Sequence, residues 1–225
     1  MSVTRRAYSS NSSNGVVLNV TKPTGTIDGD YMIAICLHGS GSDASIGAPA
    51  GWSQIGTTLI NTEFNAKVYY KVASSEGATY QFSNSISNNF HCVIISYYGH
   101  DTGTPLNDND QVINTGSQAA AISATSTPTV ANCLLVFIAM SDATATETFT
   151  WDASMTEVFD LDGIGNLILA LAEEQVTTAT SYTRTATKSG TVQRLGCMIL
   201  ALAPATGGGS SIAPVAVNNA LQQQG

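Results

Sequence analysis

The chain has 225 residues, of which 43% are hydrophobic and only 11% are charged, so neutral polar side chains must make up most of its surface. Sixteen acidic residues against eight Lys and Arg give a formal net charge of −8, and this argues against binding to nucleic-acid phosphates or to an anionic membrane. No apolar run approaches the roughly 20 residues that span a bilayer.

Short blocks of β-branched and aromatic residues, separated by Gly, Asn, Asp, Ser and Pro, predict an all-β chain without a long helix. About a dozen short strands are typical of a sandwich or barrel. Tyr31–Leu37 is continuously apolar and should be a central strand, whereas Ser181–Thr185 alternates and should have one wet face. In chain order we expect strands at Gly15–Thr21, Asp30–His38, Trp52–Ile60, Ala66–Ser74, Thr79–Ser83, Phe90–Tyr98, Ala119–Thr125, Cys133–Ser141, Met155–Leu161, Leu167–Val176, Ser181–Thr187 and Val192–Leu202.

The second half of the chain repeats the pattern of the first. The offset between matching positions grows slowly, from 99 at Trp52/Trp151 to 102 at Tyr80/Tyr182 and 105 at Cys92/Cys197. Small insertions in turns explain such a drift. The fold class that we predict is therefore a jelly-roll-like antiparallel β-sandwich with a pseudo-duplicated half. The two halves should share one core. Within one continuous sandwich we expect the following residues to be mostly buried: Ile33, Ile35, Trp52, Tyr70, Ile94, Val136, Ile138, Leu169 and Ile199.

The two ends of the chain differ in composition from its middle. Residues 1–14 are expected to form an N-terminal arm, residues 15–203 the sandwich domain and residues 204–225 a C-terminal tail. The first residues lack the apolar stretch of a signal peptide, so we expect no secretion by that route. We expect both ends to be assembly devices, in which Arg5 and Arg6 reach an acidic neighbour while Ile212, Val215 and Val217 extend a neighbouring sheet.

Several motifs resemble catalytic or metal sites, and each has a plainer interpretation. The segment His38–Asp43 resembles the oxyanion turn of α/β-hydrolases, but no G-x-S-x-G motif occurs in the sequence. The three histidines, at 38, 91 and 100, share no ligand spacing. The acidic stretch Asn107–Asp110 offers oxygen ligands for calcium, while Asp160–Asn166 contains the hairpin signal Asp-Gly. Glu173 and Glu174 are adjacent in a strand and should point to opposite faces.

The cysteines at positions 36, 92, 133 and 197 all lie in predicted apolar strands and form no C-x-x-C motif. Synthesis in a cytoplasm and burial predict four reduced, unreactive thiols. We assign no catalytic, cofactor-binding or metal-binding residue and expect no cofactor.

The first half also resembles a known type of module. The motifs are Pro23–Asp30 before an apolar strand, Pro49-Ala50-Gly51-Trp52, Tyr69–Ala73 and Glu76–Phe82. Together they resemble a β-sandwich module of tailed-bacteriophage virion proteins, found in tail fibres and on capsid surfaces. The resemblance covers about Val16–Gly99, and the second half lacks the Pro-x-Gly-Trp and Tyr-Tyr-Lys elements.

This resemblance implies a non-enzymatic structural protein of a phage virion, made in the host cytoplasm. A capsid decoration (cement) protein is favoured, because the chain shows no fibrous repeat. Its partners would be copies of itself, a trimer being one option, and the major capsid protein. The alternative is a tail-fibre or receptor-binding protein that stacks Tyr31, Tyr97 and Tyr98 on host glycans, and the third reading is a polysaccharide-degrading enzyme.

Overall fold

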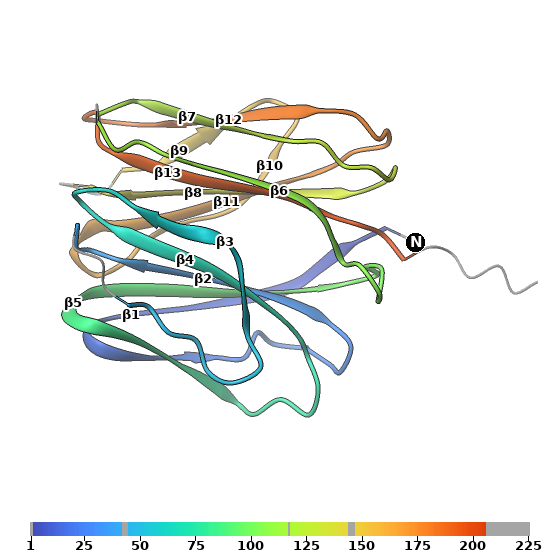
Figure 1. The fold of residues 1–225 in the computed structure, drawn as a ribbon, viewed down its shortest axis with the longest axis horizontal. Helices are drawn as coiled ribbons and strands as arrows, with labels where there is room; N and C mark the ends of the chain where they lie inside the picture. The colour runs from blue at the N-terminus through green and yellow to red at the C-terminus, as the bar shows by residue number, and fades with distance from the viewer. Residues whose placement is uncertain (1, 42–44, 117, 144–146, 206–225) are drawn as a thin grey trace, which may run out of the picture.

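The computed structural model describes the whole chain except residues 1, 42–44, 117, 144–146 and 206–225. It consists of strands joined by loops and one short 3-10 turn, η1 (Ile164–Asn166) (Figure 1). The strands are β1 (Thr4–Thr21), β2 (Tyr31–His38), β3 (Ser53–Ile60), β4 (Asn65–Val72), β5 (Thr79–Tyr98), β6 (Leu106–Ile113), β7 (Ala121–Ser126), β8 (Leu134–Asp142), β9 (Phe149–Trp151), β10 (Thr156–Asp162), β11 (Leu167–Gln175), β12 (Tyr182–Lys188) and β13 (Leu195–Leu202).

Three antiparallel sheets stack in layers, which confirms the predicted all-β sandwich (Figure 1). The first sheet has the strand order β1-β5-β2-β4-β3 and packs face to face with the second, of order β10-β11-β8-β13-β6. The third sheet, β7-β12-β9, covers the other face of the second. Strands β2, β8 and β13 are buried along almost their whole length, as continuous apolar runs require when both faces are covered.

The apolar side chains form three cores, and the innermost is shared by the two halves, as the sequence predicted. The inner core lies between the first two sheets and contains Ile33, Ile35, Val136, Ile138 and Leu169. One outer core lies under the third sheet and contains Ile199; the other, on the far face of the first sheet, contains Ile94. Trp52 and Tyr70 pack against these cores but are only partly buried. A sheet that is apolar on both faces needs a cover on each, and this produces several cores.

The cover of the first sheet comes from the ends of its own long strands. Residues 4–15 of β1 pair with residues 88–98 of β5 in the first sheet; after a register shift, residues 17–21 pair with residues 79–83 in the outer layer. In that layer Leu18, Val20, Tyr80 and Phe82 point inward, while the residues between them are exposed. The expected N-terminal arm, residues 1–14, is therefore corrected: from Thr4 onward it is an edge strand of the sandwich.

The two halves of the chain have the same topology, which confirms the pseudo-duplication. β2, β4 and β3 correspond to β8, β11 and β10, while β1 corresponds to β6 and β7, and β5 to β12 and β13. The pairing registers agree as well. Ile35 lies opposite Val93 and Val68, as Ile138 lies opposite Met198 and Leu171. Position 36 therefore corresponds to position 139, and position 92 to position 197.

The halves meet at two seams, and the strand that each half contributes to one seam corresponds to the strand that the other half contributes to the second seam. At one seam β1 lies along β10, where the Tyr8 and Phe159 rings are 4.8 Å apart. At the other, β3 lies along β6, and the Gln111 side chain accepts a hydrogen bond from Thr57 N (2.8 Å) and donates to Thr57 Oγ1 (2.7 Å). Because β10 corresponds to β3 and β6 to β1, this reciprocal arrangement is that of an approximate twofold axis between the halves.

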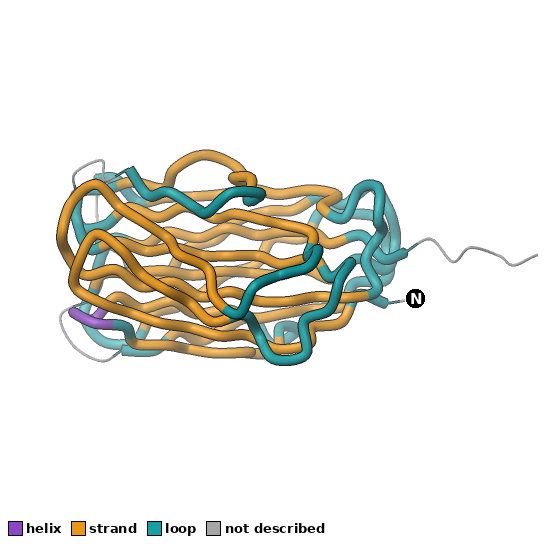
Figure 2. The backbone as a smooth tube through the Cα atoms, turned by 90° about the horizontal axis from the view of Figure 1, so that it is seen from below, coloured by secondary structure: helices purple, strands orange, loops and turns teal. Residues whose placement is uncertain are grey.

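The strands run lengthwise, and many of the connecting loops lie at the two ends (Figure 2). One end, which we call the terminal end, holds the N-terminus and the last described residues (Figure 1). There the linker between the halves, residues 99–105, touches both: Ala205 N donates to Gly99 O (2.8 Å), and a side chain added at Gly99 would collide with the Ser2 carbonyl. The other end, where β2 and β8 finish, we call the opposite end.

Candidate functional site

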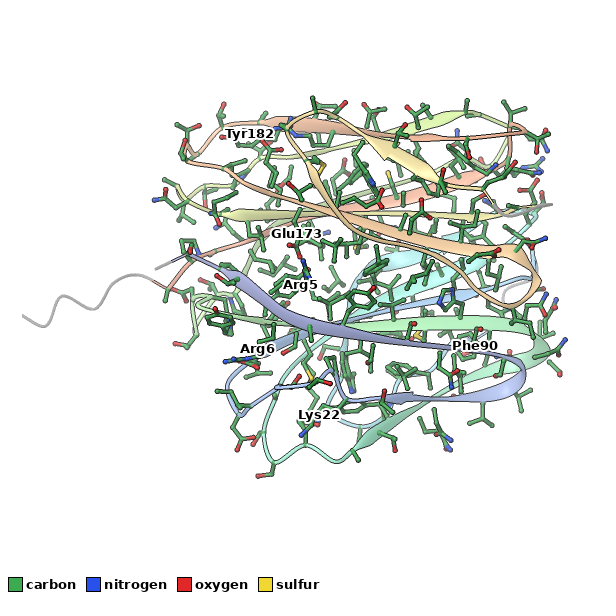
Figure 3. All side chains as sticks on the ribbon, turned by 180° about the vertical axis from the view of Figure 1, so that it is seen from behind. Arg5, Arg6, Lys22, Phe90, Glu173 and Tyr182 are labelled. Carbon is green, nitrogen blue, oxygen red and sulfur yellow. A yellow bond between two sulfur atoms is a disulfide. The ribbon has the colours of Figure 1, made fainter. Side chains whose placement is uncertain are left out.

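Arg5 ties the two large sheets together near the terminal end. Its guanidinium lies 3.1 Å from Glu173 Oε1 of β11, and the same oxygen accepts a hydrogen bond from the Tyr97 hydroxyl (2.9 Å). Figure 3 shows Arg5 and Glu173 side by side across the seam. Burial raises the pKa of Glu173, and the neighbouring Arg5 and Tyr97 partly offset that rise. Arg5 thus neutralises a carboxylate of its own chain.

Arg6 is also held within the chain. Its Nε lies 2.6 Å from Asp30 Oδ2, an oxygen that also accepts hydrogen bonds from Ile27 N and the Ser96 hydroxyl. The hydrogen bond to Asp30 raises the pKa of Arg6, and the guanidinium lies 4.4 Å from the centre of the Tyr98 ring. The two arginines that we expected to reach an acidic neighbour are therefore both paired with acids of their own chain. The other expected assembly residues, Ile212, Val215 and Val217, lie outside the described residues.

All eight Lys and Arg residues lie in the described part of the chain, and each has an internal partner. Besides Arg5 and Arg6, four form ion pairs, and Lys22 and Lys67 donate to backbone carbonyls. The other four pairs are Lys71–Glu76, Arg184–Glu174, Lys188–Glu147 and Arg194–Glu63. As predicted, Glu173 and Glu174 point to opposite faces, the first toward Arg5 in the first sheet and the second toward Arg184 in the third.

The two outer layers of the molecule carry rows of neutral polar side chains. On the third sheet two hydroxyl pairs lie across β7 and β12 and a third lies just beyond their ends, at distances of 2.8–2.9 Å: Ser123–Thr185, Thr125–Thr183 and Thr127–Ser181. On the outer layer of the first half, Gln81 donates to Asn19 (3.4 Å). Such faces can make many weak contacts that depend little on salt.

Two of the three tyrosines expected to stack on glycans are inaccessible. Tyr31 and Tyr97 have no exposed surface, because they face the inner core. Tyr98 is 41% exposed, but Arg6 lies over its ring. Stacking by all three tyrosines is therefore excluded.

The histidines do not come together. His91 faces the inner side, where its Nδ1 donates to Leu167 O (3.1 Å), while the His38 ring bonds Ile86 O (2.9 Å) on the outer side. His100 lies at the terminal end, 5.5 Å from the Tyr31 ring. Burial lowers the pKa of all three rings, which favours their neutral form. Among the described residues no group of three or more His, Cys, Asp or Glu side chains is placed to hold a metal ion.

The acidic stretch considered for calcium is part of strand β6. There Asp110 Oδ2 accepts the Thr125 amide (3.0 Å) and Asp108 Oδ2 accepts the Ser126 hydroxyl (2.8 Å). These carboxylates satisfy the open edge of β7, a role that the sequence did not reveal. The other acidic stretch forms the predicted turn, in which Gly163 N donates to Leu167 O (2.9 Å).

The expectation of four free thiols is wrong for one pair. Cys36 and Cys92 form a disulfide with a Cα–Cα distance of 4.3 Å, whereas Cys133 and Cys197 are free and buried. The reason is the register of β2 and β5, which places Cys36 directly opposite Cys92. The sequence located both residues in buried strands but carried no signal for this register.

Comparison with known proteins finds no matching family model, curated protein or solved structure. The described residues contain no helix long and apolar enough to cross a membrane.

Proposed function

We propose that the protein is a structural component of a tailed-phage virion. Of the two virion roles considered we favour a capsid decoration protein that works as a homo-oligomer. The observation that carries this proposal is the internal pairing of all eight cationic side chains, together with the hydroxyl and amide side chains that line the outer layers. A surface of this kind suits repeated lateral contacts that persist when the salt concentration changes.

Rigidity also supports a structural role. Both seams between the halves are closed, by Arg5–Glu173 and Tyr8–Phe159 on one side and by Thr57–Gln111 on the other. The linker and the two described chain ends lie together at the terminal end. In the proposed assembly the terminal end attaches, and the opposite end projects.

The attachment is assigned to the apolar part of the tail sequence, which includes Val215 and Val217. An extended apolar segment can add a strand to an exposed sheet edge of a neighbour. The same segment has polar neighbours in the sequence, Asn218 and Asn219, which offer a matched control.

The test compares three chains by light scattering and by binding to purified particles: the full chain, Val215→Asp with Val217→Asp, and Asn218→Asp with Asn219→Asp. Both double variants add the same charge, but only the first removes apolar side chains. We expect the valine variant alone to lose assembly at an unchanged melting temperature. Equal assembly by all three chains contradicts the attachment model. A full chain that stays monomeric and binds glycans supports the tail-fibre alternative instead, and electron microscopy of particles locates the protein.

A further inference from the structure

We infer that the Cys36–Cys92 disulfide is a redox-controlled lock on the first half of the sandwich, closed by a disulfide oxidant and shielded by the outer layer. The inference stands on the geometry around the two sulfurs and is independent of the proposed function. Its chemical partner is a small disulfide such as oxidised glutathione, or the dithiol that reverses the reaction.

The lock lies where the first half changes layers. Strand β5 runs through the outer layer as residues 79–83 and then enters the first sheet, where Cys92 faces Cys36 of β2. The bond therefore fixes the inner part of β5 to the central strand of the sheet. A cross-link between residues 56 positions apart also removes many conformations from the unfolded chain.

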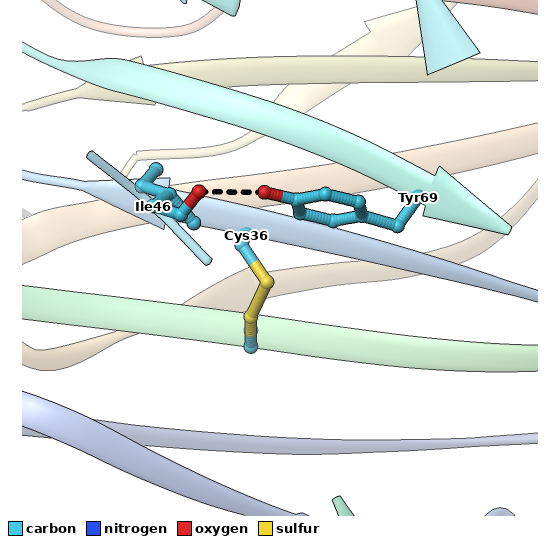
Figure 4. The surroundings of a disulfide bond; sticks show 4 residues. Cys36, Ile46 and Tyr69 are labelled. Atoms are coloured by element: carbon cyan, nitrogen blue, oxygen red, sulfur yellow. Dashed lines mark hydrogen bonds between the residues drawn. A yellow bond between two sulfur atoms is a disulfide. The ribbon is translucent and has the colours of Figure 1, made fainter. Parts of the chain in front are cut away.

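Both sulfurs are covered. Cys36 and Cys92 have no exposed surface and lie in the outer core of the first half with Ile46, Tyr69 and Phe82. Figure 4 shows Ile46 beside the disulfide, held by a hydrogen bond from the Tyr69 hydroxyl to its carbonyl (2.7 Å). The same carbonyl accepts Lys67 Nζ (3.0 Å), and the next residue, Gly47, exchanges two backbone hydrogen bonds with Ser83. This covering segment, Ile46–Gly47, must lift before a reagent reaches either sulfur.

The reaction balances with one oxidant molecule. One thiol loses its proton and attacks oxidised glutathione, which releases one glutathione thiolate and leaves a mixed disulfide. The second cysteine, after losing its proton, attacks the protein sulfur of that mixed disulfide and releases the second glutathione. Two thiols have then given two electrons and two protons, and the oxidant has become two thiols. In a cytoplasm, where glutathione and thioredoxin keep thiols reduced, we expect the dithiol form.

The second half has no such lock. Cys197 occupies the position that corresponds to Cys92, but it faces Ala139. Burial raises the pKa of the Cys197 thiol to about 12 and also raises that of Cys133. Cys133 and Cys197 lie in the outer core of the second half, whereas the disulfide lies in the outer core of the first half, so we expect no exchange between them in the folded protein.

The test counts thiols and measures rates on the full-length protein. After treatment with oxidised glutathione, the denatured protein should show two free thiols, and after reduction in urea it should show four. Dithiothreitol should reduce the native protein about a hundredfold more slowly than the urea-unfolded protein, because the covering segment must open first.

Tyr69→Phe removes one hydrogen bond of the covering segment and should speed native reduction about fivefold. Tyr182→Phe is the matched control, since it removes a hydroxyl bonded to Thr178 in the outer layer of the second half and should leave the rate unchanged. Four thiols after oxidation would overturn the lock. Equal native and unfolded rates, or equal rates in the two phenylalanine variants, would overturn the shielding.

Discussion

The two halves of the sandwich share one strand order but differ in the chemistry that secures it. The first half carries five basic and six acidic residues through position 103, a net charge of −1, whereas the rest of the chain carries three and ten, a net charge of −7. The first half has a disulfide where the second has Ala139 opposite Cys197. The two halves share the apolar pattern of their strands and the same topology, although they differ in net charge and in the presence of a disulfide. We infer that the apolar pattern determines this topology.

The edges of the outer layers differ in the same way. In the first half, the side chains of Ser9, Asn11 and Ser13 donate to carbonyls of the outer part of β1. In the second half, Asp110, which corresponds to Ser9, accepts an amide of β7. Both devices satisfy backbone groups that an open strand edge leaves unpaired. The first half uses side-chain donors and the second half a side-chain acceptor. Corresponding positions thus stabilise the strand edge with different residue types.

The largest expected effect tests whether the halves form one folding unit. Ile35→Ala and Ile138→Ala remove corresponding side chains of the inner core, both fully buried, and each should cost about 2–5 kcal/mol. Guanidinium melts would be followed by tryptophan fluorescence in Trp151→Phe and Trp52→Phe backgrounds, which report on the first and second half respectively. Both reporters should show the same midpoint for each alanine variant.

A control for this prediction is Val130→Ala, since Val130 is 40% exposed and its loss should change the free energy of unfolding by less than about 0.5 kcal/mol. Two separate transitions in either background would show that the halves unfold independently.

The second prediction concerns a variant in which the second half also carries a disulfide. Ala139→Cys places a thiol opposite Cys197, and oxidation should add a disulfide worth about 2–4 kcal/mol, with one free thiol left. Ala170→Cys is the matched control, because β11 is separated from β13 by β8, and cysteines two strands apart are too distant to bond. Three free thiols in oxidised Ala139→Cys would show that the halves differ in register.

The third prediction concerns Asp142, which corresponds to Gly39 and ends β8 at the opposite end. Burial, and secondarily the nearby Glu63, raises the pKa of Asp142 from 3.8 to about 6. The folded state therefore binds the proton more tightly than the unfolded state, so this group's contribution to stability is complete below about pH 4 and is lost as the pH rises through 6.

Asp142→Asn removes the ionisation. It should stabilise the protein at pH 7.5 by roughly 1–2 kcal/mol, after allowance for partial exposure, and by nothing at pH 4. Urea melts at the two pH values measure this difference. A gain of the same size at both would assign the effect to packing instead of charge.

The smallest expected effect concerns the edge of β7. Asp110→Ala should cost about 0.5–1.5 kcal/mol and speed hydrogen exchange at the Thr125 amide, whereas Asp110→Asn keeps an acceptor and should restore protection. Ser9→Ala, the corresponding change in the first half, should cost about 0.5 kcal/mol. Unchanged exchange in Asp110→Ala would mean that the carboxylate does not secure this edge.

The sequence predicted the central strands well, because strands such as β2 and β8 are apolar throughout, and the drift of matching positions revealed the repeat. It missed the three-residue edge strand β9, and it missed residues 4–14 of β1 and all of β6, which are edge strands rich in Ser, Asn and Asp. Their polar side chains serve the outer layers, and this depends on contacts between residues far apart in the chain. The disulfide was missed for the same reason, since only the register of β2 and β5 brings Cys36 to Cys92.

The meeting of Ser2, Gly99 and Ala205 at the terminal end has a consequence for chain connectivity. Each half begins and ends at the terminal end, so the first and last residues of each half lie close together. Joining Ala205 to Ser2 through a short spacer and cutting the linker near Gly103 reverses the order of the two halves without moving a strand. We therefore expect the same fold from a gene that encodes the two halves in the reverse order.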